Sequence, residues 1–144
     1  MEPSRIPPLL QEIPDAPKQL YLRGPFPDPS IYKFLTIIGS RKHSSYGKQV
    51  CEHLIEGLRG YPIVIVSGLA LGIDSIAHRT AIKNNLLTIA VPGSGLDDSV
   101  LYPATNRGLA HNILTAGGCL LSEYEPNFKA TNWSFPKRNR IMAG

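Results

Sequence analysis

Four short apolar runs recur along the sequence, and each is followed by a residue at which an extended strand can end. They cover residues 34–38, 63–66, 86–91 and 119–122. Short runs rich in Val, Ile and Leu are typical of strands buried on both faces of a parallel sheet. Because amphipathic stretches separate them, the sequence predicts alternating strands and helices joined by right-handed crossovers.

The stretch between the first two runs shows the helical pattern. Val50, Leu54 and Leu58 are spaced i, i+4 and i+8, with Cys51 and Ile55 beside them. This spacing predicts an amphipathic helix whose apolar stripe faces the sheet. Similar patterns predict two further helices, over residues 73–81 and 109–116.

Proline and glycine divide the chain into two parts. Eight of the 13 prolines precede residue 30, whereas 12 of the 13 glycines follow residue 38. We therefore expect an extended, Pro-rich N-terminal lead-in over residues 1–32 and a globular domain over residues 33–144. Residues 140–144 look like the opening of another helix after only four strands. The sequence thus predicts a fold that is truncated in its C-terminal half.

Charge and composition limit the functional classes. The 144 residues include 15 Lys and Arg against 11 Asp and Glu, and the net charge of +4 favours an anionic partner, although a solvated surface would show the same balance. No apolar run approaches the ~20 residues that cross a bilayer, so no membrane partner is expected. The N-terminus lacks a secretion signal, which favours the cytoplasm. Cys51 and Cys119 lack the paired short spacing of zinc sites, and neither a metal nor a cofactor is expected.

The loop after the first strand has the composition of a phosphate site. It contains Gly39, which lets the backbone turn, together with the hydroxyl of Ser40 and the charge of Arg41. Ligands of open α/β sheets bind where strands end and helices begin, and free N–H groups of the next helix would point to the same place. The alternative is an ordinary turn in which Ser44 or Ser45 caps that helix.

The loop after the second strand allows two interpretations. Ser67-Gly68 and Gly72 permit close approach of a ligand, or equally tight packing of the helix on the strand. Asp74 and His78, one helical turn apart, suggest a hydrolase triad with Ser67. No Gly-x-Ser-x-Gly elbow surrounds the serine, so we favour a structural role for Asp74 at the helix start.

The C-terminal segment combines aromatic rings with cations. Trp133 and Phe135 precede three cations, Lys137, Arg138 and Arg140. Single-stranded nucleic acid is bound by this combination, because bases stack on rings while cations neutralise phosphates. The alternative is a core aromatic residue followed by a charged helix start. Cations at a helix N-terminus are unfavourable by themselves, which favours an anionic ligand there.

Six motifs carry a resemblance to a known family, and they occur in the family's order. They cover residues 38–41, 66–74, 95–97, 102–103, 121–124 and 135–140. From about residue 33 to its end the sequence resembles the DNA-processing protein A family, also called DprA or Smf. The resemblance implies a Rossmann-like parallel sheet with helices on both faces. It also implies single-stranded DNA binding and loading of the RecA recombinase during natural transformation, without catalysis, by a protein that is a homodimer at full length.

The family's functional residues are carried over by motif. The implied DNA-binding residues are Gly39, Ser40 and Arg41 in a phosphate pocket, Ser67 and Gly68 in the neighbouring loop, Phe135 as a stacking platform, Lys137, Arg138 and Arg140 as a cationic wall, and Asn139 as an orienting residue. Two departures matter. The family's domain continues well beyond residue 140, and Ala104 stands where relatives often carry a basic residue after Tyr102-Pro103.

Two other functions remain as alternatives. The fold class also resembles that of nucleotide phosphoribohydrolases, whose Pro-Gly-Gly-x-Gly-Thr loop is matched only in part by Pro92-Gly93-Ser94-Gly95, with Glu123 as the downstream acid. A nucleotide-binding sensor would use the same edge of the sheet. The incomplete loop leaves Glu123 without its usual companions, which counts against the enzyme. A mononucleotide pocket has little need for Lys137, Arg138 and Arg140 beyond Arg41, which counts against the sensor.

Overall fold

The structure is a computed structural model that describes residues 3–4, 15, 17 and 19–143. Its sheet has the strand order β1-β2-β6-β5-β4-β3. The four predicted strands pair in parallel and in chain order, which confirms the Rossmann-like sheet expected from the sequence. They are β3 (Lys33–Thr36), β4 (Ile63–Ser67), β5 (Thr88–Ala90) and β6 (Cys119–Ser122).

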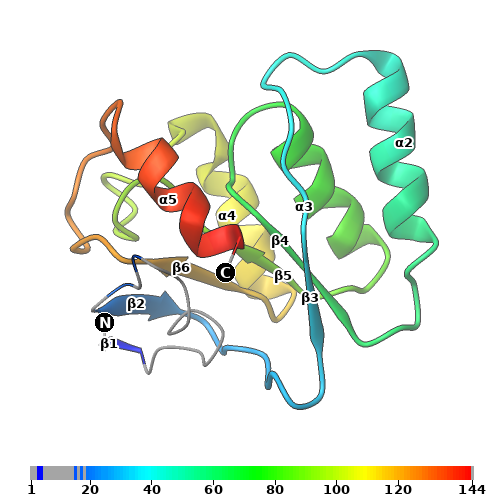
Figure 1. The fold of residues 1–144 in the computed structure, drawn as a ribbon, viewed down its shortest axis with the longest axis horizontal. Helices are drawn as coiled ribbons and strands as arrows, with labels where there is room; N and C mark the ends of the chain where they lie inside the picture. Colours follow the sequence, from blue (N-terminus) through cyan, green and yellow to red (C-terminus); the bar gives the residue numbers. More distant parts are fainter. Residues whose placement is uncertain (1–2, 5–14, 16, 18, 144) are drawn as a thin grey trace.

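Helices cover both faces of this sheet, as predicted (Figure 1). Because consecutive strands advance in one direction, right-handed crossovers place the three connecting helices on the same face. These are α2 (Ser45–Glu56), α3 (Ile73–Lys83) and α4 (Arg107–Thr115), the last preceded by the 3-10 helix η1 (Ala104–Asn106). After β6 the chain crosses to the other face, where α5 (Ser134–Ala143) lies.

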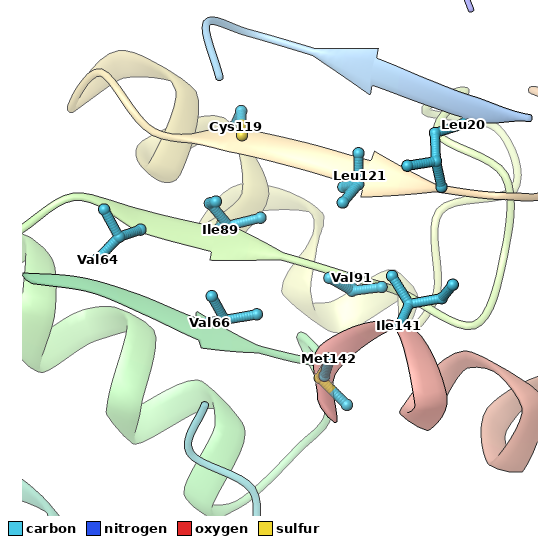
Figure 2. Close-up of a cluster of buried hydrophobic side chains, with 9 residues drawn as sticks. All are labelled: Leu20, Val64, Val66, Ile89, Val91, Cys119, Leu121, Ile141 and Met142. Atoms are coloured by element: carbon cyan, nitrogen blue, oxygen red, sulfur yellow. The ribbon is translucent and has the colours of Figure 1, made fainter. Parts of the chain in front are cut away.

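Strand side chains alternate between the two layers of the core. Val64, Val66 and Val91 belong to the cluster beneath α5, and Figure 2 shows Ile141 and Met142 of α5 near Val66 and Val91. The intervening residues of the same strands belong to clusters that include α2, α3 and α4. The hydroxyl of Thr36 donates to the Met142 carbonyl at 2.7 Å and ties the end of α5 to β3. The position of α5 across the sheet is therefore fixed by both packing and hydrogen bonding.

The lead-in contributes strands of its own to the sheet. β2 (Leu20–Arg23) pairs antiparallel with β6, and β1 (Pro3–Ser4) pairs antiparallel with β2. Leu20 is completely buried in the cluster beneath α5. The apolar stretch of β2 is short and lies among prolines, so its sequence pattern is too weak to indicate a strand. The prediction for the rest of the lead-in lies outside the described residues, because it concerns residues 1–2, 5–14, 16 and 18.

Helix α2 packs on a different stripe from the one that the spacing predicted. Cys51 and Ile55 are buried, whereas Val50 is 47% and Leu54 is 52% exposed. Leu58 follows the helix and packs against the core as predicted. The exposed stripe of Val50 and Leu54 and the buried stripe of Cys51 and Ile55 are both apolar. The apolar surface of the helix is therefore wider than the face that meets the sheet. The sequence does not show which half of such a surface is covered.

A buried histidine organises the start of α3. The Leu69 N–H donates to His78 Nε2 at 3.2 Å, and His78 Nδ1 lies 2.7 Å from Thr88 Oγ1, which itself donates to the Ile65 carbonyl at 2.9 Å. These directions require the neutral ring with its proton on Nδ1. Burial, assisted by the charge of Arg79, lowers the pKa of His78 to about 3.

This histidine predicts a loss of stability in acid. The unfolded chain binds a proton at His78 below about pH 6.5, whereas the folded state binds none until the pH nears its lowered pKa. The free energy of unfolding should therefore fall by about 1.4 kcal/mol for each pH unit below 6.5, or about 2 kcal/mol by pH 5. Urea titrations at pH 7 and pH 5 measure the loss. His78→Gln should remove most of it; an equal loss in the variant would contradict the assignment.

Candidate nucleic-acid interface

Several loops meet the first turn of α5 at one edge of the sheet, where β3, β4, β5 and β6 end. Figure 1 shows the loops that lead into α2 and α3, and the beginning of α5, along this edge, which we call the carboxyl edge. Residue 72 is a glycine with φ of +81°, and a Cβ there would lie 2.2 Å from the Ser40 carbonyl oxygen. The same oxygen accepts a hydrogen bond from Ile73 N at 3.2 Å. The absence of a side chain at Gly72 thus lets the two predicted ligand-binding loops touch.

A cation and two aromatic rings meet at the carboxyl edge. The guanidinium carbon of Arg41 lies 5.6 Å from the centre of the Phe135 ring, and Tyr102 packs against the same ring at 5.3 Å and a tilt of 58°. Arg41 is exposed and Phe135 partly exposed. A small pocket opens between them, lined by Arg41, Gly68, Ala70, Leu71, Tyr102, Pro103 and Phe135. The structure therefore brings together the predicted phosphate-binding arginine and the predicted stacking ring.

Arg138 lies inside the protein rather than on a cationic wall. It is 7% exposed, and its Nη1 donates to the carbonyls of Gly68 at 2.9 Å and Val91 at 2.7 Å. Its guanidinium carbon lies 5.6 Å from the centre of the Phe135 ring. Burial lowers the pKa of Arg138, and the nearby carboxylate of Asp74 opposes that shift. Arg138 thus connects the stacking ring to the ends of β4 and β5.

Ser67 and Gly68 also support the loops from within. The Ser67 hydroxyl donates to the Ile37 carbonyl, and Gly68 N donates to Asp74 Oδ2 at 3.0 Å. Burial raises the pKa of Asp74, while the hydrogen bond from Gly68 and the charge of Arg138 act against the rise. These bonds confirm the structural interpretation of Asp74. The hydrolase triad is not formed, because the Ser67 hydroxyl and both nitrogens of His78 are bonded to other groups.

Sequence reasoning missed one residue of this scaffold. The buried amide of Asn106 donates to the Leu69 carbonyl and to the Ser75 hydroxyl, both at 2.8 Å. It holds the loop between β4 and α3, in which Leu69 has a φ of +64°. Tyr102-Pro103 marks the preceding loop in the sequence, but nothing in the pattern indicates that an amide three residues later supports a different loop.

The remaining cations of α5 point in different directions. Arg140 forms a bidentate ion pair with Glu123, at 2.5 and 2.7 Å, and its Nε lies 3.2 Å from Asp15 Oδ2. Lys137 is exposed, while Asn139 is exposed and accepts a hydrogen bond from Arg138 Nε at 2.9 Å. Lys137 and Arg140 are three positions apart, but Arg138 between them is buried and Arg140 is paired with Glu123, so the three cations do not form one wall. Neither Lys137 nor Arg140 lines the pocket beside Arg41.

Three further findings concern other functional classes. Within the described part of the chain, no group of three or more His, Cys, Asp or Glu residues is arranged to hold a metal ion. No helix in that part is long and apolar enough to cross a membrane. Glu123, the acid required by the phosphoribohydrolase alternative, has both carboxylate oxygens paired with Arg140.

The fold and the site define a class: a Rossmann-like α/β protein whose carboxyl edge presents an exposed cation beside aromatic rings. Residues 1–144 match the family model of the DNA recombination-mediator protein A, and the chain belongs to that family. Several curated relatives are similar along most of its length. DNA processing protein DprA of Streptococcus pneumoniae is 43% identical over 137 residues, which are 94% of this chain and 46% of that protein.

Other relatives show the same coverage. Protein Smf of Escherichia coli is 37% identical over 139 residues, and DNA processing protein DprA of Bacillus subtilis is 39% identical over 135 residues. These matches cover 96% and 94% of this chain but only 36% and 44% of the two proteins. The chain thus spans less than half the length of these curated relatives.

Two solved structures share the fold. The crystal structure of DNA processing protein A from Streptococcus pneumoniae superposes with a TM-score of 0.84 at 41% identity, covering 95% of this chain and 47% of that one. DNA processing protein A from Helicobacter pylori superposes with a TM-score of 0.80 at 36% identity, covering 96% and 62%. The structure of the Helicobacter pylori protein gives insight into the single-stranded DNA binding mode of that protein. These comparisons support a DNA-processing role for the family to which this chain belongs.

Proposed function

We propose that this chain binds single-stranded DNA along its carboxyl edge. The observation that carries the proposal is the exposed guanidinium of Arg41 beside the partly exposed ring of Phe135, at one pocket. A phosphate would bind Arg41 and the exposed hydroxyl of Ser40, while a base would stack on the ring. The single-stranded DNA binding mode described for the Helicobacter pylori relative supports this assignment.

The predicted site residues fall into two groups in this proposal. Those with exposed or partly exposed side chains and no ion pair among the described residues contact DNA: Ser40, Arg41, Phe135, Lys137 and Asn139. The others hold the contacting residues in place: Gly39, Ser67, Gly68, Arg138 and Arg140. Contacts to phosphates and ring faces discriminate poorly among bases, so we expect little sequence preference.

The whole protein's role follows from this binding. We infer that the DNA is delivered to the RecA recombinase during natural transformation, in the cytoplasm, with no catalytic step. We assign the recombinase contacts and the homodimer interface to the part of the relatives outside the match to this chain. This match covers 46% of the Streptococcus pneumoniae protein. Binding, rather than loading, is therefore the property to test in this chain.

Arg41→Ala should weaken binding and reduce its dependence on salt. Loss of one charge-assisted contact of about 1.5 kcal/mol corresponds to an affinity about tenfold lower. One fewer phosphate contact should reduce the slope of log affinity against log salt by about 0.7. Fluorescence anisotropy of a labelled oligo-dT across a salt series measures both quantities.

A charge control separates local contact from general attraction. Lys83 is an exposed cation in the last turn of α3, away from the carboxyl edge. Lys83→Ala removes the same charge and should leave affinity and slope close to those of the unmodified chain. If Arg41→Ala behaves like Lys83→Ala, the proposed pocket is not the DNA site.

A further inference from the structure

A second aromatic cluster lies beside the first turn of α5, outside the pocket of Arg41 and Phe135. Tyr124 and Phe128 stack with their ring centres 4.6 Å apart, and Trp133 meets them edge-on at 6.0 and 5.6 Å. Tyr124 is buried, and its hydroxyl donates to the Ser134 carbonyl at 3.0 Å. Trp133 is nevertheless 55% exposed. The indole therefore packs against Tyr124 and Phe128, while the rest of it is exposed to solvent.

Cations without acidic partners accompany this indole. The Lys137 ammonium lies 5.9 Å from the centre of the Trp133 ring, and Lys129, four positions before Trp133, is exposed. Among the described ion pairs, neither lysine has a carboxylate partner. Arg140, in contrast, is neutralised by Glu123. An exposed ring with a cation over it that has no carboxylate partner among the described ion pairs is the composition that binds unpaired bases and their phosphates.

This cluster and the pocket contact different residues of the first turn of α5. Trp133 and Phe135 flank Ser134, the first residue of α5. Lys137 lies over Trp133, whereas Arg138 lies over Phe135. The N-terminus of α5, whose dipole favours phosphate, lies between the two rings.

We propose that Trp133 and Lys137 form a second stacking site for single-stranded DNA, which continues the bound strand from the pocket across the first turn of α5. This inference rests on the proposed function of the carboxyl edge. In the bound state a base takes the place of the Lys137 ammonium on the indole, and the flexible lysine moves to the adjacent phosphate. The site accounts for an exposed indole that the pocket of Arg41 does not use.

The sequence contains one tryptophan, so its fluorescence reports on this site alone. The full chain is titrated with fluorescein-labelled dT20, and anisotropy of the label and emission of Trp133 are recorded in parallel. Stacking should quench the emission with the same midpoint as the anisotropy change. Trp133→Ala should weaken binding about fivefold or more with an unchanged salt slope, because the indole carries no charge.

Variants distinguish stacking from general effects. Trp133→Phe should retain most of the affinity, since it keeps an aromatic face. Lys137→Ala should retain the quenching but reduce the salt slope by about 0.7. Tyr61→Ala is the matched control: its ring is 64% exposed and precedes β4, at the opposite edge of the sheet, so binding should not change. Circular dichroism confirms folding, and quenching of Trp133 in the unmodified chain provides the test if Trp133→Ala does not fold.

The two readouts separate the two proposals. Anisotropy that rises without quenching, together with unchanged affinity in Trp133→Phe and Trp133→Ala, overturns the second site and leaves DNA binding at the pocket intact. That result would assign the exposed indole to a protein interface, where Trp is common. An anisotropy that does not rise at all overturns the proposed function and this inference with it.

Discussion

Replacing Arg138 by methionine is expected to lower the free energy of unfolding by about 3–5 kcal/mol, the cost typical of removing one partner from a buried charged network. The guanidinium is 7% exposed and donates to the carbonyls of Gly68 and Val91. Methionine fills much of the same space but donates nothing, so both carbonyls lose a partner. The carboxylate of Asp74 also loses the positive charge that opposes the effect of burial.

The control for this variant is the neighbouring residue. Lys137 is exposed, and Lys137→Met should change the free energy of unfolding by less than about 0.5 kcal/mol. Urea unfolding of the two variants and of the unmodified chain provides the comparison. Equal stabilities for the two variants would contradict the buried role of Arg138.

The Arg138 variant should also show a pH dependence of its own. Burial already raises the pKa of Asp74, and loss of Arg138 raises it further. A carboxyl group whose pKa is higher in the folded state contributes stability at low pH that is lost as the pH rises through that pKa. The deficit of the variant relative to the unmodified chain should therefore be smaller at pH 5 than at pH 8. His78 is present in both proteins, so its contribution cancels, and a constant deficit would exclude the charge interaction.

The fold was predictable where local patterns report directly on packing. The parallel strands follow from apolar runs whose length and β-branched content leave little choice, and residues such as Val64 and Ile65 serve opposite faces of the sheet. Residues 20–23 were not predicted as a strand, because their pairing depends on β6, nearly a hundred positions later. A short strand among prolines carries no local signal strong enough to indicate such a partner.

The candidate site was predictable as a location more than as a set of contacts. Parallel topology alone brings Arg41 and the start of α5 to one edge, which the contact between Arg41 and Phe135 bears out. The direction of each side chain depends on helical phase and on partners distant in sequence. Arg138 turns inward to the carbonyl of Gly68, and Arg140 turns to Glu123. Three cations within four positions look equivalent in a sequence, yet their environments differ completely.

Gly72→Ala should have an effect comparable to that of Arg138→Met, by a steric route. The residue has φ of +81° and ψ of −130°, a conformation that side chains rarely adopt. A Cβ atom would lie 2.2 Å from the Ser40 carbonyl oxygen and 2.5 Å from that of Arg41, and both are backbone atoms. Backbone strain and overpacking together should lower the free energy of unfolding by about 3–5 kcal/mol.

The same substitution elsewhere should have the opposite sign. Gly108 lies in α4, and a Cβ atom at this position would have no neighbour within 4 Å, so Gly108→Ala should raise the free energy of unfolding by about 0.5–1 kcal/mol. Urea unfolding of both variants measures the two effects. Because the strain at Gly72 falls on the loop that carries Ser40 and Arg41, folded Gly72→Ala should also bind oligo-dT more weakly, whereas Gly108→Ala should bind normally. Normal stability and binding in Gly72→Ala would show that the two loops at the carboxyl edge do not touch.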